Sequence, residues 1–205
     1  MTSINSVTLE VSDLPAAEAF YDAAFGLGPR LGLRASDSSS SGFRGFTLSL
    51  VASQPGTVDA LIGSGLDAGA TEIKPAKKSF WGYGGVLRAP DGAIWKVATS
   101  SKKDSGPATR EVDEFVLLLG AADVPASKGF YGDHGVTVAK SFARKYVQFD
   151  TGPKITLALY GRRALAKDAG VDADGSGSPR LVIGGDGGAF TDPDGFVWEG
   201  SMAAP

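Results

Sequence analysis

The pattern of apolar positions predicts short strands alternating with helices. Residues 4–11 carry apolar side chains at intervals typical of a strand. Asp13 follows and is placed to cap a helix, with Pro15 in the first turn and Gly26 near the end. Apolar and polar side chains then alternate over 46–51, which predicts a second strand.

The rest of the chain continues this order and then repeats it. A helix is predicted over 57–67, followed by a hairpin of strands 85–88 and 94–98 around Pro90-Asp91-Gly92. In the second part, strands are expected at 113–120, 136–142, 145–150 and 155–160, helices at 124–133 and 162–169, and a last hairpin around Asp194-Gly195. Each half thus reads β-α-β-β-β with an additional helix, and segments 35–42 and 172–179 are expected to be mobile loops.

Two short motifs occur twice in the same order, which indicates an internal duplication. The segment Asp13-Leu-Pro with Phe20-Tyr21 returns 110 residues later as Asp123-Val-Pro with Phe130-Tyr131. The Asp-Gly-x-x-Trp segment that ends at Trp95 returns 103 residues later, ending at Trp198. A shared order of motifs is the signature of a repeated module.

The composition between the two copies is that of a linker. Residues 101–110 are polar and contain Gly106 and Pro107, so we place the boundary near residue 106. The predicted organisation is a first module over 1–100 and a second over 111–205.

Charge and residue types exclude several classes of function. The net charge of −3 argues against general binding to nucleic acid or to an anionic membrane. The chain has no Cys and a single His, His134, which excludes thiolate chemistry and metal sites with several histidines. No stretch resembles a signal peptide or a membrane span, so a cytoplasmic protein is expected.

The two repeated motifs resemble those of the vicinal oxygen chelate superfamily, which includes glyoxalase I, extradiol dioxygenases and bleomycin-resistance proteins. The resemblance covers both halves, from Asp13-Leu-Pro and Phe20-Tyr21 to Asp192-Pro-Asp-Gly and Trp198-Glu199. It implies an α+β fold in which two βαβββ modules form a curved mixed sheet, a cup around a small ligand.

The same resemblance implies four positions for metal ligands, and this chain does not keep them. Counted from the motifs, they fall on Ser6, Lys96, Val116 and Glu199. Only Glu199 suits a divalent cation, whereas a catalytic metal needs about three protein ligands. We therefore expect no metal and no other cofactor.

Other residues are candidates for contact with a ligand. Trp81 and Tyr83 stand in a glycine-rich segment and could stack on a flat molecule at the mouth of a cup, although ordinary loop packing is an equal alternative. Trp95 and Trp198 are expected in the core, because strand alternation turns them away from the cup. The predicted ligand-binding set is Ser6, Thr8, Trp81, Tyr83, Arg88, Lys96, Tyr146 and Glu199.

Three functions remain open at this point. The first is a metal-free protein, monomer or homodimer, that holds a small organic molecule and binds neither nucleic acid nor membrane. The second is an enzyme, a glyoxalase-like lyase or isomerase, with Glu199 as its catalytic base. The third is a partner-binding module, in which the protein's own side chains would fill the cup.

A specific geometry is predicted for two of the implied metal positions. If both modules form one cup, the final-strand residues Lys96 and Glu199 converge on the place of the metal. A cation and a carboxylate there should form an ion pair.

Overall fold

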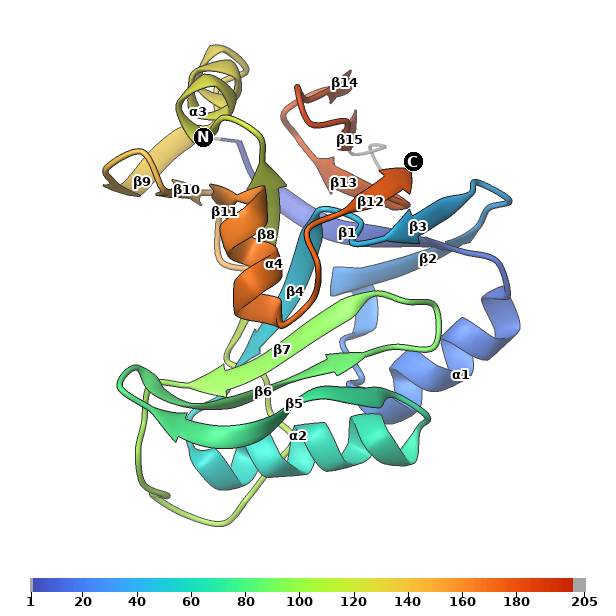
Figure 1. Ribbon diagram of the computed structural model, residues 1–205, viewed down its shortest axis with the longest axis vertical. Helices are drawn as coiled ribbons and strands as arrows, with labels where there is room; N and C mark the ends of the chain where they lie inside the picture. Colours follow the sequence, from blue (N-terminus) through green and yellow to red (C-terminus); the bar gives the residue numbers. More distant parts are fainter. Residues whose placement is uncertain (1, 201–205) are drawn as a thin grey trace.

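The computed structural model, which describes residues 2–200, places most strands in two mixed sheets (Figure 1). The larger sheet has eight strands in the order β5 (Thr71–Ser79), β6 (Gly82–Arg88), β7 (Ile94–Thr99), β4 (Phe46–Val51), β8 (Glu114–Ala121), β11 (Thr156–Gly161), β10 (Tyr146–Asp150) and β9 (Thr137–Phe142). The smaller has five, in the order β14 (Phe190–Thr191), β15 (Val197–Gly200), β13 (Leu181–Gly185), β1 (Ile4–Val11) and β2 (Leu31–Ala35).

Within residues 2–200, four α-helices and one helical turn accompany the sheets. They are α1 (Leu14–Ala24), the 3₁₀ turn η1 (Gly28–Arg30), α2 (Pro55–Asp67), α3 (Val124–Asp133) and α4 (Arg162–Ala169). Asp13 and Asp123 cap α1 and α3, each accepting a hydrogen bond from the backbone N–H three residues on. The cap predicted at Asp13 is therefore confirmed, and its counterpart in the second copy of the motif caps α3 in the same way.

The main hydrophobic core joins the two sheets. It takes the buried side chains of β1, such as Leu9, and those of the central strands β4, β7 and β8, such as Leu48 and Leu117. Trp95 and Trp198 are 0% and 1% exposed, which confirms the expectation that both belong to the core. Each sheet therefore has one face in the core and one face that turns away from it.

In each half, residues of the two repeated motifs form hydrogen bonds with one another inside this core. In the first half the Tyr21 hydroxyl donates to Asp91 (3.0 Å) and accepts from the Trp95 indole (3.4 Å). In the second half Tyr131 donates to Asp192 (2.7 Å) and accepts from Trp198 (3.3 Å). The duplicated residues thus build the same Tyr–Asp–Trp cluster twice.

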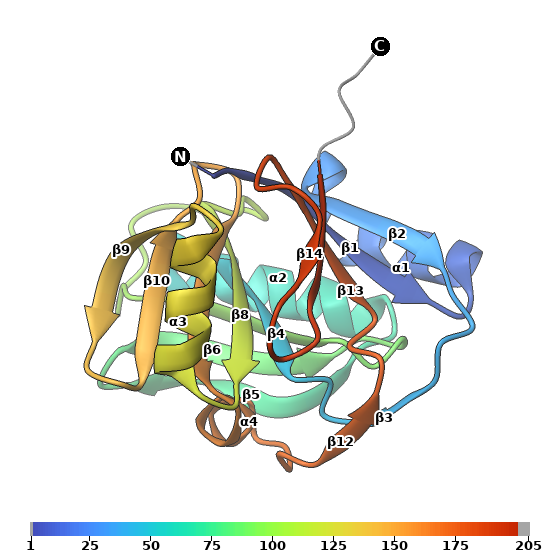
Figure 2. The ribbon, with the colours of Figure 1, turned by 90° about the horizontal axis from the view of Figure 1, so that it is seen from above.

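The two halves share their order of elements and are interleaved in space. Strand β4 of the first half pairs antiparallel with β8 of the second, and β1 pairs antiparallel with β13. Figure 2 shows β13 beside β1, and β2 flanks β1 on its other edge, so the C-terminal strands complete the sheet that the N-terminal strand begins. The outer ends of the two predicted modules, Met1 and residues 201–205, lie outside the described residues.

Two segments expected to be mobile loops form structure. Within 35–42 and 172–179, the short strands β3 (Ser40–Gly42) and β12 (Gly175–Gly177) pair antiparallel with each other. The prediction was wrong here because it used only local composition, while the backbone hydrogen bonds come from a segment about 135 residues away in sequence. Strands β2, β5 and β13 were missed, since their Gly, Lys and Pro content hides the pattern of a strand.

The segment proposed as a linker is held against α2. The buried Gln54 side chain accepts hydrogen bonds from Ser105 and Gly106 and donates to the carbonyls of Gly106 and Pro107. Asp104 accepts from the Gly56 backbone N–H at 2.7 Å. The connection between the halves is therefore packed at the start of α2.

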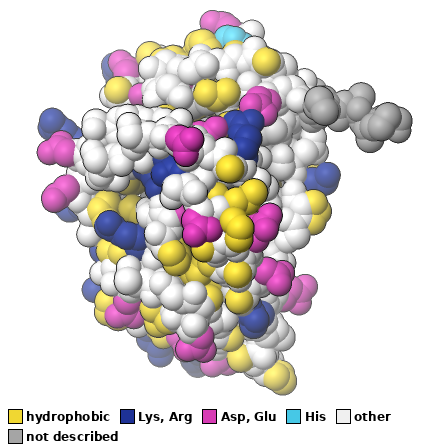
Figure 3. Space-filling model, turned by 90° about the vertical axis from the view of Figure 1, so that its right-hand side faces the viewer, with side chains coloured by type: hydrophobic (Ala, Val, Ile, Leu, Met, Phe, Trp, Pro, Cys, Tyr) yellow, Lys and Arg dark blue, Asp and Glu magenta, His cyan; other side chains and the backbone are white. Residues whose placement is uncertain are grey.

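The surface carries charges of both signs. Acidic and basic side chains are scattered over the side of the molecule shown in Figure 3. Among residues 2–200, no helix is long and apolar enough to cross a lipid bilayer.

Candidate functional site

The face of the eight-stranded sheet that turns away from the core holds the main candidate site. We call it the cavity face; it carries Val86, Lys96 and Leu118. Helix α4 begins directly after β11 and packs on this face, where Leu165 and Ala169 join a cluster with Phe43, Val86 and Ile94. Helix α2 covers β5, β6 and β7 from the opposite side (Figure 1).

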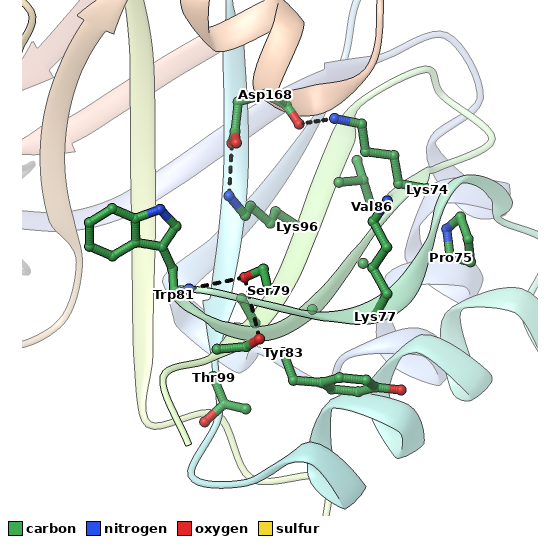
Figure 4. A pocket seen from close by; sticks show the side chains of 14 residues that line it. Lys74, Pro75, Lys77, Ser79, Trp81, Tyr83, Val86, Lys96, Thr99 and Asp168 are labelled. Atoms are coloured by element: carbon green, nitrogen blue, oxygen red, sulfur yellow. Dashed lines mark hydrogen bonds and ion pairs between the residues drawn. The ribbon is translucent and has the colours of Figure 1, made fainter. Parts of the chain in front are cut away.

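A cavity of about 290 Å³ remains beside α4 (Figure 4). Its floor is formed by β6 and β7, its edge by β5, and one wall by Asp168 in the last turn of α4. Apolar groups predominate among the lining atoms, with the charges of Lys74, Lys77, Lys96 and Asp168 around them.

Glycines keep the floor of this cavity open. A Cβ atom on Gly84 would lie 2.6 Å from the Val97 carbonyl oxygen, and one on Gly82, at φ +136°, would collide with the Thr99 carbonyl. Larger side chains are therefore excluded at both positions, and backbone atoms form the floor. The glycine-rich segment seen in the sequence is required by this close approach of β6 to β7.

An ion pair joins the floor to the wall. Lys96 Nζ lies 2.7 Å from Asp168 Oδ2, and the two side chains are 38% and 49% exposed. Lys74 Nζ donates to the backbone carbonyls of Lys167 (3.1 Å) and Asp168 (2.6 Å), which occupy the C-terminal end of α4. A cation at this end of a helix is favourable, because the last carbonyls lack partners within the helix.

The two aromatic candidates lie on opposite sides of the sheet. Trp81 lines the cavity and its side chain is 83% exposed, on the same side of β6 as Lys96 (Figure 4). Tyr83 points to the other side, where its hydroxyl donates to Asp59 of α2 at 2.7 Å, a hydrogen bond that raises the pKa of the tyrosine. Tyr83 therefore adds little beyond its backbone to the cavity, whereas Trp81 offers a free ring.

A row of residues runs across the four central strands on the cavity face. Lys96, Ser49, Val116 and Thr156 lie directly opposite one another in successive strands. Ser49 is 7% exposed, and its hydroxyl has no hydrogen-bond partner among the described residues. A buried hydroxyl without a hydrogen-bond partner lowers the stability of the folded state. Here that hydroxyl lies in the strand next to Lys96.

The other motif-derived candidates lie on the five-stranded sheet. Ser6 and Glu199 flank Gly184 in one row on the face that turns away from the core, with Thr8 on the same face. Arg34 joins two carboxylates there, with Nη2 2.8 Å from Glu10 and Nη1 3.0 Å from Glu199. These hydrogen bonds raise the pKa of Arg34.

The predicted ion pair between Lys96 and Glu199 is wrong. Lys96 pairs with Asp168, and Glu199 pairs with Arg34. The two residues lie on different sheets, on faces that both turn away from the shared core. The prediction placed both final strands in one cup, while the β4–β8 and β1–β13 pairings put them in two sheets.

Two further candidates lie away from the cavity. Arg88, at the end of β6, lines a separate open cavity together with Arg163 and Lys167. Tyr146 is half-buried on β10, and burial, followed by the charge of Glu114, raises its pKa. Neither residue is among those that line the cavity at Trp81.

The sequence missed Lys74, Lys77, Ser49 and Asp168 as parts of this region. Lys77 resembled an ordinary solvent-exposed lysine, and Asp168 belongs to the other half of the chain. No local pattern marks these residues, because long-range contacts bring them together: α4 carries Asp168 to the lysines, and the pairing of β4 with β7 places Ser49 beside Lys96.

The residues at the implied metal positions do not fit a divalent cation. Lys96 and Val116 lie in one row and Ser6 and Glu199 in another, so neither row offers more than one carboxylate. Over residues 2–200, no group of three His, Asp or Glu side chains is arranged to hold a metal ion.

Comparison with known proteins defines the class of fold. No protein-family model matches the sequence, and no curated protein matches it. Glyoxalase I from Zea mays superposes with a TM-score of 0.62 at 13% identity, covering 97% of this chain and 91% of that one. A putative dioxygenase from Bacillus subtilis superposes with a TM-score of 0.61 at 10% identity, covering 99% and 86%.

The protein is thus an α+β protein built on mixed sheets. More narrowly, it has the fold of glyoxalase I over nearly its whole described length, which confirms the fold that the repeated motifs implied.

Proposed function

We propose that this protein binds a small, planar organic molecule in the cavity between β5–β7 and α4. The observation that carries the proposal is the arrangement of Trp81, an exposed indole ring beside a floor of glycine backbone and small apolar groups. Concave, mostly apolar sites with a few polar groups are typical of small-molecule binding. An aromatic ring at the mouth adds stacking to the burial of apolar surface.

The position of Glu199 makes the enzyme alternative less favourable. This carboxylate lies on the five-stranded sheet, paired with Arg34, and is not among the residues around the cavity. A general base must reach the proton that it removes in the bound substrate. A molecule held beside Trp81 lies against the eight-stranded sheet, whereas Glu199 belongs to the five-stranded sheet.

The partner-module alternative receives support at one end of the cavity face only. Leu165 and Ala169 of α4 cover the sheet around Val86 and Ile94, as a cup filled by its own side chains requires. The region from Lys96 to Thr99 keeps its open space, and this is where we place the ligand.

Titration with 2-naphthamide, a neutral planar probe, tests the proposal. Trp81→Ala should weaken binding by about 1–3 kcal/mol, because the probe loses its stacking surface. Phe80→Ala is the matched control: Phe80 is adjacent, is 80% exposed and does not line the cavity. Isothermal titration calorimetry on the three proteins gives the comparison.

Equal affinity of the wild type and of Trp81→Ala for 2-naphthamide would show that the probe does not bind in this cavity. An equal loss in both variants would show that the probe binds the exposed hairpin tip instead. Absence of probe binding to the wild type would contradict the proposed function.

A further inference from the structure

The charges around the cavity oppose the charge of the whole chain. Three lysines and one aspartate line it, whereas the protein has a net charge of −3. The cavity is therefore a local positive region on an acidic protein. Clefts lined by one sign of charge attract ligands of the other sign.

The three lysines are not equivalent. The Lys74 ammonium donates to the backbone carbonyls of Lys167 and Asp168 at the end of α4. These hydrogen bonds leave it less available to a ligand than Lys96. Lys96 rises from the floor, and its ammonium group meets the carboxylate of Asp168 at 2.7 Å. The protein thus already places one carboxylate on Lys96, at the boundary between the cavity and its wall.

The Lys96–Asp168 pair is open to exchange. Both side chains are partly exposed, and such ion pairs are weak because water screens them. Asp168 can rotate away without unwinding α4, since Lys74 holds the backbone carbonyls of the last turn and Gly170 ends the helix. A carboxylate brought by a ligand would then replace one acceptor with another on the same ammonium.

A second group on the cavity face fits an acid. Ser49 lies next to Lys96 in the adjacent strand, just behind the residues that line the cavity, and its buried hydroxyl has no partner among the described residues. A hydroxyl donor beside an ammonium is a suitable pair for a carboxylate, which accepts several hydrogen bonds.

We propose that the ligand of this cavity is an aromatic or other planar carboxylic acid, whose carboxylate displaces Asp168 from Lys96 while its planar part lies against Trp81. This inference rests on the proposed function and adds the chemical class of the ligand. It assigns Asp168 the role of an internal competitor that occupies Lys96 until the acid binds.

The test compares 2-naphthoate with its neutral counterpart 2-naphthamide, in the wild type and in four variants: Asp168→Asn, Lys96→Met, Lys78→Met and Trp81→Ala. The wild type should bind the acid more tightly, and Asp168→Asn should strengthen acid binding by about 5- to 10-fold, because a charged competitor is removed. Lys96→Met should bring the acid down to the affinity of the amide. The affinity for the amide should change little in either variant.

Lys78→Met is the matched control for long-range charge. Lys78 neighbours Lys77 on β5 but is not among the residues that line the cavity. Its removal should leave the preference for the acid intact. Circular dichroism and the urea midpoint of each variant verify that it is folded.

The outcomes separate this inference from the function on which it rests. Equal affinity of the wild type for the acid and the amide, with both lost in Trp81→Ala, would overturn the inference and leave the binding function. A preference for the acid that survives Lys96→Met, or that disappears in Lys78→Met, would also overturn it. Failure of both probes to bind would reject the proposed function itself.

Discussion

At the scale of single residues, the repeated motif is a hydrogen-bonded cluster that holds each half together. Asp192 is 5% exposed and accepts hydrogen bonds from the Tyr131 hydroxyl and from two backbone N–H groups. Burial raises the pKa of Asp192, while the hydrogen bond from Tyr131 opposes that shift. Burial, followed by the charge of Asp192, raises the pKa of Tyr131 well above its usual value.

Tyr131→Phe tests how much this cluster stabilises the protein. The substitution leaves a buried carboxylate oxygen and the Trp198 indole N–H without their partner, which should cost about 1.5–3 kcal/mol. Tyr160→Phe is the control, because the Tyr160 hydroxyl has no hydrogen bond to another described residue. Urea unfolding of both variants measures the difference, and equal midpoints would show that the cluster adds nothing.

Asp192→Asn tests the pH dependence that burial imposes. Because the pKa of Asp192 is raised in the folded state, the folded protein takes up this proton before the unfolded chain does as the pH falls. The wild type should therefore gain stability relative to Asp192→Asn as the pH falls through the folded pKa. The gain should level off below about pH 3.9, where the unfolded carboxyl is protonated too.

The free energies of unfolding of both proteins from pH 7 to pH 3 provide this comparison. A constant difference would mean that Asp192 titrates alike in the two states. A difference of the opposite sign would mean that hydrogen bonding outweighs burial at this carboxyl.

At the scale of elements, α4 decides the shape of the candidate site. The helix follows β11 with no loop and ends at Gly170, which adopts the left-handed conformation at φ +82°. This glycine closes the helix and leaves room for Lys74, whose Cε would lie 2.5 Å from a Cβ atom at position 170. The end of α4 and the position of the cavity wall therefore depend on one glycine.

Gly170→Ala should lower the free energy of unfolding by about 1–2 kcal/mol and disturb the Lys74 contacts, because a side chain is strained at this φ. Gly161→Ala is the matched control at the other end of α4: its φ is −58°, and an added Cβ meets no atom within 4 Å. Chemical unfolding compares the two. Equal stability of both variants would contradict the role assigned to Gly170.

At the scale of the whole molecule, the two halves depend on each other. The β4–β8 and β1–β13 ladders both join the first half to the second, and the core is continuous between them. Separated halves would expose long apolar strands as unpaired edges, which favours aggregation. Duplication in the sequence has therefore not produced two independent structural units.

Separate expression of residues 1–106 and 107–205 tests this dependence. Neither fragment should show a cooperative unfolding transition alone, while an equimolar mixture should recover the circular dichroism and the buried tryptophan emission of the intact chain. A fragment that folds cooperatively alone would contradict the interleaved arrangement. The intact protein serves as the reference.

Local pattern was sufficient where neighbours in sequence carry the information. The spacing of apolar residues located α3 and α4 with the observed bounds, and Asp13 and Asp123 marked the helix starts. The burial of Trp95 and Trp198 followed from strand alternation. In the candidate site, the glycine-rich segment indicated Trp81, which the structure places at the cavity.

The sequence by itself determined the helices, most of the longer strands, the duplication and the fold class, because caps, periodicity and short motifs act over a few residues. Only the tertiary structure decided which strands pair across the halves, and thereby that Lys96 meets Asp168 rather than Glu199. It also decided that α4 covers one end of the cavity face and leaves the other open. These outcomes depend on contacts between residues far apart in the chain, whose energies no local pattern contains.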